Sequence, residues 1–294
     1  MFNEKREEFF EIYHNARARF IRHPKYMIKV ERYITEIVNT LIAENYPEIK
    51  RDYNEASYLN AFWANYPPDD RGRSPKGDQI PWIEVGEHSV GHKLNRLIAE
   101  KFYIEEVGLP SGADNRFVLY SEEIEEITHG LTNCAFVFLD IKSVGPRDNF
   151  EHTVISPYQV SGDGLWNNPF ENMINTPMTA KGSRVTHEFY PAISPIYPLS
   201  NGKAAPTVHL FVKPVYSMLS ELSEGQGQPL DYIKNICVPN GLLLMESPNY
   251  LEDYPNLFFP GKDDKGKDPK KIRVRVSFSV LKSINTWRVS EFTA

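Results

Sequence analysis

Cysteines and long hydrophobic runs are both scarce in this chain. Only two of its 294 residues are cysteines, Cys134 and Cys237, and they form no CxxC pair. This excludes a disulfide scaffold and a cysteine-based zinc finger, and it favours a reducing, cytoplasmic location. The longest uninterrupted apolar run is residues 134–139. Because a membrane span needs about 18 apolar residues, the sequence predicts no membrane partner.

The first residues also do not show the pattern expected of a secretory leader, and the sequence has no excess of positive charge. Its first eight residues carry charges of both signs, so we expect no signal peptide there. In total, the chain has 33 Lys and Arg residues and 39 Asp and Glu residues, which gives a net charge of −6. This balance argues against indiscriminate coating of nucleic acid. It still allows specific DNA binding by basic groups that are gathered in one cleft.

What the sequence does contain is the composition of a globular protein, with 41% hydrophobic and 24% charged residues. No internal repeat, low-complexity tract or linker divides it. We therefore expect one elaborated α/β domain over residues 1–294.

Helices are predicted where apolar residues recur every three to four positions. One amphipathic stretch lies within residues 9–21 and ends before Pro24. The next carries its apolar face over residues 30–42 and is expected to end at Pro47, because proline disrupts a helix interior. A third helix is predicted over residues 87–102.

Strands are predicted after the helix at 87–102. Residues 134–141 are a continuous apolar run, which is typical of a central strand buried on both faces. In residues 272–280, apolar and polar residues alternate strictly, as in a strand with one face on the core. Loops with short strands are expected over residues 145–206. Further strands are predicted at 116–120, 207–212 and 242–245.

The triplet Asp140-Ile141-Lys142 ends the apolar run. Strand side chains alternate, so residues 140 and 142 point to the same face. Asp114 precedes the strand at 116–120, which is a candidate hairpin neighbour. Two carboxylates at adjacent strand ends could share Mg²⁺, and Lys142 could orient or activate a water, as phosphodiester hydrolysis requires. The alternative is a surface ion pair, because Asp-x-Lys triplets are frequent by chance.

A basic segment near the C-terminus is a candidate for DNA reading. Between residues 259 and 275 there are seven basic and three acidic residues. Arg273 and Arg275 project from one face of the predicted strand, and arginine suits the O6/N7 edge of guanine. Carboxylates such as Asp264 can accept a hydrogen bond from cytosine N4. The alternative is a solvated loop followed by a polar strand face.

Residues 114 and 140–142 together resemble the PD-(D/E)xK nuclease motif, although Ala113 stands where the motif has proline. The surrounding sequence resembles the type II restriction endonucleases of that superfamily over nearly the whole chain. The segments that carry this resemblance are 77–87, 140–148, 205–211, 238–241 and 260–264.

The resemblance implies a restriction-endonuclease-like fold with a mixed central sheet flanked by helices. Its core would span roughly 80–215, with a DNA-reading strand and loop at roughly 255–285. It also implies a Mg²⁺-dependent homodimer that cuts double-stranded DNA at GCC-N5-GGC and leaves 5′-phosphate ends. A cognate DNA methyltransferase would accompany the enzyme in the cell.

The resemblance further assigns roles to individual residues. Asp114 and Asp140 would be metal ligands, joined by the backbone carbonyl of Ile141. Lys142 would be the catalytic lysine and Glu87 an accessory acid. Glu87 has an equally simple alternative as a solvated carboxylate in the first turn of a helix. The base-reading residues would be Asp148, Lys262, Asp264, Arg273 and Arg275.

Two other functions remain open. A repair or recombination nuclease would keep Asp114, Asp140 and Lys142 but cut without strict site specificity. A catalytically inactive protein would bind its DNA site without cutting, although the intact motif argues against this.

Overall fold

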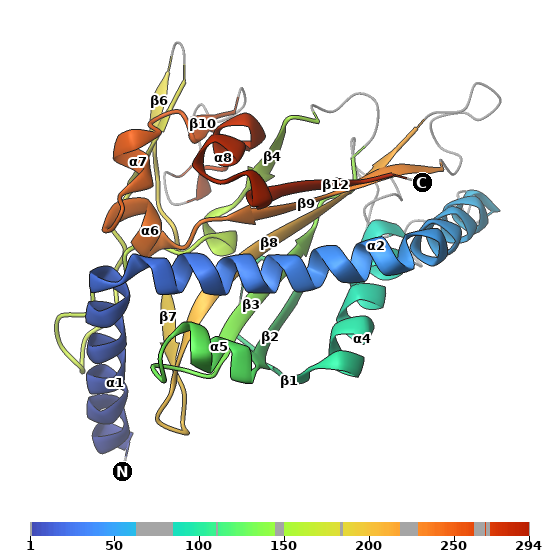
Figure 1. Ribbon diagram of the computed structural model, residues 1–294. Coiled ribbons are helices and arrows are strands. Elements are labelled where there is room, and N and C mark those ends of the chain that lie inside the picture. Colours follow the sequence, from blue (N-terminus) through green and yellow to red (C-terminus); the bar gives the residue numbers. More distant parts are fainter. Residues whose placement is uncertain are drawn as a thin grey trace.

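The computed structural model describes residues 2–62, 85–109, 111–144, 150–182, 185–217, 229–261, 268 and 271–293. Within these residues a seven-stranded mixed sheet forms the centre of the molecule (Figure 1), and six of its strands follow the order β1-β2-β3-β8-β9-β12, while β7 pairs with β8. The strands are β1 Tyr103–Glu106, β2 Asn115–Tyr120, β3 Cys134–Ile141, β7 Ile196–Pro198, β8 Ala204–Tyr216, β9 Leu230–Val238 and β12 Val289–Phe292. The predicted mixed sheet is therefore confirmed.

The centre of this sheet combines one hairpin with one parallel pair. Strands β2 and β3 are antiparallel, and Asn115 lies opposite Leu139. The same register places residue 114, just before β2, opposite residue 140. Strand β3 pairs in parallel with β8, which begins more than 60 residues after the end of β3. The ends of β2 and β3 that carry the predicted acidic residues therefore meet at one edge.

The sheet is buried on both faces, as the continuous apolar runs predicted. Val208, Leu210 and Val212 of β8 belong to a core with helices α2 (Pro24–Phe62) and α4 (His92–Lys101). Phe211, between them, belongs to a second core on the opposite face. Every residue of β3 and of β8 is buried.

Helices cover one face of the sheet, and the long α2 crosses it in Figure 1. None of the described helices is both long and apolar enough to cross a membrane. The α-helices are α1 Phe2–Arg22, α2 Pro24–Phe62, α4 His92–Lys101, α5 Glu122–Ile127, α6 Gly241–Met245, α7 Tyr250–Asp253 and α8 Phe278–Ile284. A π-helical turn, Glu87–Gly91, leads directly into α4.

The prediction that Pro47 ends its helix was wrong, because α2 continues to Phe62 with Pro47 inside it. The apolar face continues beyond the proline, and Ile49 and Tyr53 are fully buried in the core with the sheet. Packing of this face outweighs the hydrogen bond that proline cannot donate.

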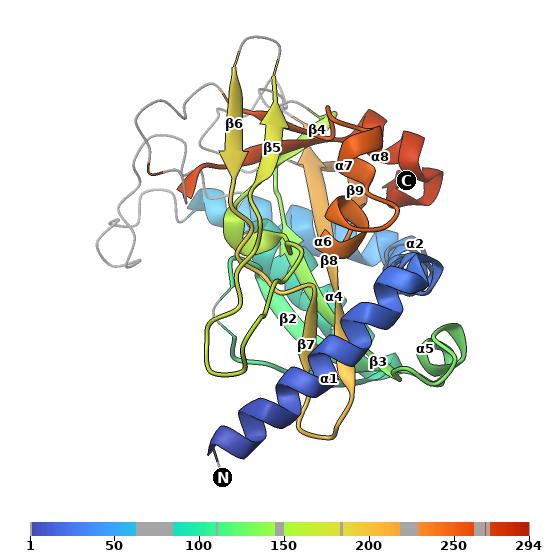
Figure 2. The ribbon, with the colours of Figure 1, turned by 90° about the vertical axis from the view of Figure 1, so that its left-hand side faces the viewer.

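A smaller sheet of order β10-β11-β4 lies against the other face. Its strands are β4 His152–Ile155, β10 Phe258–Pro260 and β11 Val274–Ser277. The hairpin β5 Met178–Lys181 and β6 Thr186–Phe189 projects beside it (Figure 2). Short strands therefore occur within 145–206 as predicted.

Near the C-terminus, the strand predicted at 242–245 was wrong, and the strand predicted at 272–280 was confirmed only in part. Residues 241–245 form α6, whose first turn is capped by the Asn240 side chain accepting from the N–H of Leu242. The alternating segment 272–280 forms a strand only up to Ser277. Ser277 then caps α8 by accepting from the N–H of Val280. In both places a capping side chain decided for helix over the apolar pattern.

Candidate active site

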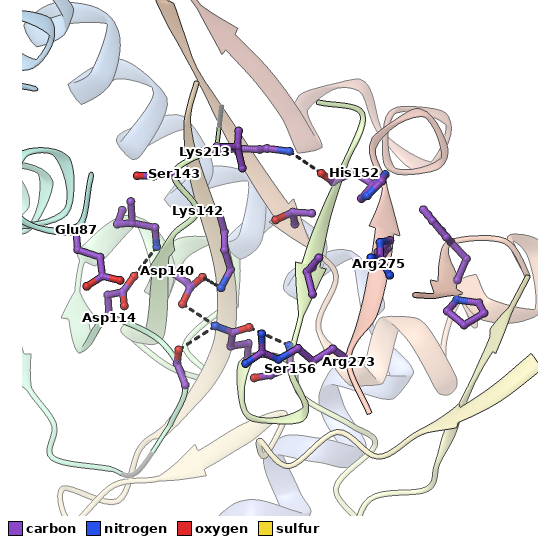
Figure 3. A pocket seen from close by; sticks show the side chains of 18 residues that line it. Glu87, Asp114, Asp140, Lys142, Ser143, His152, Ser156, Lys213, Arg273 and Arg275 are labelled. Carbon is purple, nitrogen blue, oxygen red and sulfur yellow. Dashed lines mark hydrogen bonds and ion pairs between the residues drawn. The ribbon is translucent and has the colours of Figure 1, made fainter. Parts of the chain in front are cut away.

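A cavity of about 920 Å³ lies between the end of the β2–β3 hairpin and the small sheet (Figure 3). Among its lining residues are Asp114, Asp140 and Lys142 on one side, and Arg273 and Arg275 on the other. Glu87 and Ile141 line it as well, so the structure brings seven of the predicted site residues to one cavity from separate parts of the sequence.

Asp140 is the most buried acid of the site, with 2% of its surface exposed. Its Oδ2 lies 2.6 Å from Nζ of Lys142, as the same-face argument predicted. Its Oδ1 accepts a 2.7 Å hydrogen bond from Nε2 of Gln159. Burial raises the pKa of Asp140 to about 6, against the opposing effect of the Lys142 ammonium. The ion pair is therefore not the solvated surface pair that spacing alone allowed.

Asp114 is held by the neighbouring strand. Its Oδ2 accepts a 2.6 Å hydrogen bond from the backbone N–H of Ile141. Burial raises the pKa of Asp114, while this hydrogen bond and the Lys142 charge oppose the rise. Asp114 also raises the pKa of Asp140. A carboxylate whose pKa is raised by a second, nearby carboxylate is well placed to share a cation with it.

Glu87 lines the same cavity, and Figure 3 shows it pointing toward the side of Asp114. It starts the π-helical turn that precedes α4. Gly86 lets this turn approach β3, because a Cβ atom there would lie 1.7 Å from Oγ of Ser143. The predicted accessory acid therefore lies at the site.

Lys142 and Lys213 both line this cavity. The Lys142 side chain is 25% exposed. Lys213 of β8 is 1% exposed and donates a 2.7 Å hydrogen bond to the backbone carbonyl of His152 in β4. Lys213 had no motif in the sequence. Only the parallel pairing of β3 with β8 brings it to the cavity.

Arg273 and Arg275 enter the cavity from the small sheet. Arg275 lies in β11 opposite Val154 of β4, and Arg273 directly precedes the strand. Val274 and Val276, which alternate with the two arginines, are fully buried. The predicted alternation of apolar and polar residues therefore holds here. Three predicted base readers, Asp148, Lys262 and Asp264, lie outside the described residues.

The donor set fits a hard cation held by few protein ligands. In the described part of the chain, no three His, Cys, Asp or Glu side chains are grouped to hold a metal by themselves. The buried Oδ2 of Asp140 accepts no hydrogen bond beyond its ion pair with Lys142. Mg²⁺ commonly binds through one or two carboxylates with water and phosphate oxygens completing its shell. Asp114 and Asp140 meet that requirement, and Ile141 lines the cavity beside them.

Gln159 was missed by the sequence reasoning, although it hydrogen-bonds Asp140. It ends the 3-10 turn Pro157–Gln159 and forms a capping box with Ser156. The Ser-x-x-Gln spacing is a readable signal for such a box, but nothing in it points to the active site.

Comparison with known proteins decides the family. The family described as type II restriction enzyme SfiI matches residues 26–292. The type II restriction enzyme BglI of Bacillus subtilis is 46% identical over 288 residues, which cover 97% of this chain and 96% of that enzyme. The chain belongs to this family. It is a type II restriction endonuclease, and the resemblance seen in the sequence is confirmed.

Solved structures agree with this assignment. The crystal structure of BglI bound to its DNA recognition sequence matches this restriction enzyme with a TM-score of 0.91 and 46% identity, covering 100% and 99% of the two chains. Tetrameric SfiI bound to cognate DNA matches with a TM-score of 0.58 and 16% identity, over 91% and 85%. The second likeness concerns the fold alone.

Proposed function

We propose that this restriction enzyme is a Mg²⁺-dependent homodimer that cuts double-stranded DNA at GCC-N5-GGC and leaves 5′-phosphate ends. One observation carries the proposal. Asp114, Asp140 and Lys142 lie together where the adjoining ends of β2 and β3 meet. Arg273 and Arg275 line the same cavity. One DNA duplex in this cavity would then meet both the acidic residues that bind the cation and the arginines that bind guanine.

Each residue has a distinct task in the proposed reaction. Asp114 and Asp140 would hold Mg²⁺, with the carbonyl of Ile141 as a further ligand and Glu87 as an accessory acid. The bound ion supplies charge neutralisation at the phosphate and a lowered pKa of water. Lys142 would orient the attacking water and stabilise the negative charge that develops on the phosphate oxygens.

The base-reading surface would be the small sheet and the segment before it. Arg273 and Arg275 would donate to guanine O6 and N7, in the pairing geometry that arginine provides. Asp148, Lys262 and Asp264 would complete a half-site made only of G·C pairs. Acidic groups among basic ones favour base contacts, because phosphates repel carboxylates.

The dimer would match the symmetry of the DNA. Each subunit would read one half-site and cut one strand, and its two-fold axis would coincide with that of the palindrome. The whole chain would act as one nuclease domain in the cytoplasm. A cognate DNA methyltransferase, which forms no complex with it, would protect the cell's own DNA.

Digestion of a sequenced plasmid tests the proposal. With Mg²⁺, discrete fragments whose ends map to GCC-N5-GGC are expected, and EDTA should prevent them. Discrete fragments whose ends map to a different sequence would show that the enzyme recognises that sequence and not the proposed one. A smear would indicate a nuclease without strict specificity, and a gel shift without cleavage would indicate a binding protein.

Asp140→Asn is the matched variant for this digest. It preserves the size of the side chain and removes the charge that would hold Mg²⁺. The variant should leave the plasmid intact while still shifting a duplex that contains the site. Cleavage by this variant at the wild-type rate would contradict the proposed metal site.

A further inference from the structure

The side chain of Gln159 joins three segments of the chain. Its Nε2 donates to Oδ1 of Asp140 at 2.7 Å and to the backbone carbonyl of Gly112 at 2.9 Å. Its Oε1 accepts from the backbone N–H of Ser156 at 2.9 Å. The amide nitrogen donates to two acceptors and the amide oxygen accepts from one donor, so these partners determine the orientation of the amide.

The contacts with Asp140 and Gly112 reach both acidic segments of the site. Gly112 lies two residues before Asp114, and its N–H donates to the carbonyl of Tyr158 at 2.9 Å. A Cβ atom on Gly112 would lie 3.2 Å from Cγ of Gln159, so the two loops are in close contact. Gln159 itself is 7% exposed. A displacement of its turn would therefore displace both carboxylates.

The contact with Ser156 reaches the reading sheet. Ser156 directly follows β4, and β4 pairs with β11. Ile155 lies opposite Val274, so one step further along the same register Ser156 lies opposite Arg273. Figure 3 shows Ser156 and Arg273 on this side of the cavity. The hydrogen bonds of Gln159 connect the Ser156 backbone to Asp140.

We propose that Gln159 is a positioning residue that couples base reading by Arg273 to the orientation of the Asp140 carboxylate. This inference rests on the proposed function, which makes Arg273 a base reader and Asp140 a metal ligand. When Arg273 binds the correct base, the ends of β4 and β11 are fixed relative to each other. The Gln159 amide then holds the Asp140 carboxylate in the orientation that binds the metal. A wrong base shifts this edge and weakens the 2.7 Å hydrogen bond.

A side chain that only stabilises the loop would act differently. It would lower cleavage of every DNA sequence to the same extent, and its effect would multiply with the effect of losing Arg273. A coupling residue gives a smaller combined effect, because each variant interrupts the same connection.

The test uses Gln159→Met, which keeps the length of the side chain and removes its hydrogen bonds. Single-turnover cleavage should fall by about 10–100-fold, the usual effect of losing a group that orients a metal ligand. Binding to the site in EDTA, measured by gel shift, should stay within about threefold of wild type, because no base contact is removed. The cleavage-rate ratio between the site and a site with one changed G·C pair should also fall.

Two further variants make the test sharper. Arg273→Ala combined with Gln159→Met should cleave no more slowly than the slower single variant. Asn175→Leu is the matched control, because the Asn175 amide also bridges backbone groups, donating to Pro191 and accepting from Gly164, but does not line this cavity. It should lower the unfolding temperature without changing the cleavage-rate ratio.

Gln159→Glu covers the case in which the methionine variant is poorly folded. It keeps an acceptor for the Ser156 N–H and cannot donate to Asp140 when ionised, so cleavage should fall while binding in EDTA persists. Wild-type cleavage by both variants, loss of binding together with cleavage in both, or effects that multiply with Arg273→Ala would each overturn the coupling. Failure of the wild-type enzyme to cut in Mg²⁺ would instead overturn the proposed function.

Discussion

The backbone N–H of Ile141 donates a 2.6 Å hydrogen bond to Oδ2 of Asp114. The acid that precedes β2 is thus held by the strand that carries Asp140. Because Ile141 is followed directly by Lys142, one short piece of β3 determines the positions of both carboxylates and of the ammonium. A fixed arrangement of charged groups of this kind is what electrostatic catalysis requires.

Lys142→Ala should abolish cleavage and leave site-specific binding in Ca²⁺ intact. The ammonium lies 2.6 Å from Asp140 in the cavity, whereas Arg273 and Arg275, two of the proposed base contacts, line the cavity from the small sheet. Lys101→Ala is the control, because Lys101 is an exposed lysine that pairs with Glu44 on the helical side. Plasmid digestion and gel shifts measure the two effects. Cleavage at the wild-type rate would remove Lys142 from the mechanism.

Arg275→Ala should cost about 1–3 kcal/mol of discrimination at one G·C pair. Arg275 is half-buried in β11 and lines the cavity, as expected of a base contact. Arg32→Ala removes one positive charge from an exposed pair with Glu36 and serves as the control. Competition gel shifts with single-base variants of the site give the discrimination. An equal loss of affinity for every sequence would make Arg275 a phosphate contact.

His209 should make the protein less stable as the pH falls. Burial lowers the pKa of His209 to about 3, and its Nε2 accepts the N–H of Ser161. The unfolded chain has a histidine pKa of about 6.5, so between pH 6.5 and 3 it binds one more proton than the folded protein. The free energy of unfolding should therefore fall by about 1.4 kcal/mol per pH unit from this group as the pH drops through that range.

Urea unfolding of His209→Gln between pH 7 and pH 4 measures this contribution. The variant should be less stable at pH 7 but should show a flatter dependence on pH. His129→Asn is the control, because His129 is exposed and its positive φ of 50° suits asparagine. An unchanged slope in His209→Gln would show that another group causes the acid sensitivity.

Arg288→Met should destabilise the fold by about 3–5 kcal/mol, because it leaves a buried carboxylate without its partner. Both Arg288 and Glu31 are fully buried, and they form a 2.7 Å ion pair. Burial raises the pKa of Glu31, and Arg288 opposes that rise. The double variant with Glu31→Gln should lose less than the sum of the single losses. Urea unfolding measures the cycle, and additive losses would contradict the expected coupling.

The core of the active site could be predicted from local sequence. A buried strand that ends in Asp-x-Lys places residues 140 and 142 on one face whatever surrounds it, because side-chain direction alternates along every strand. The acid at 114 followed from a hairpin between neighbouring strands. Both depend only on short-range geometry, and both agree with the structure.

The errors occurred where distant contacts or a cap decided the conformation. The helix across Pro47 persists because Ile49 and Tyr53 are buried in the core with the sheet. The segment 241–245 is a helix because Asn240 caps it. A pattern of apolar residues alone does not contain this information.

The amino-acid sequence by itself therefore determined the family, the two central strands and the acidic and basic groups at their end. The tertiary structure alone decided that Lys213 and Gln159 join these groups, and that Arg273 and Arg275 face them across one cavity. The physical reason is that these contacts pair segments far apart in the chain. Their positions depend on how whole sheets pack, which the spacing of residues within one segment does not specify.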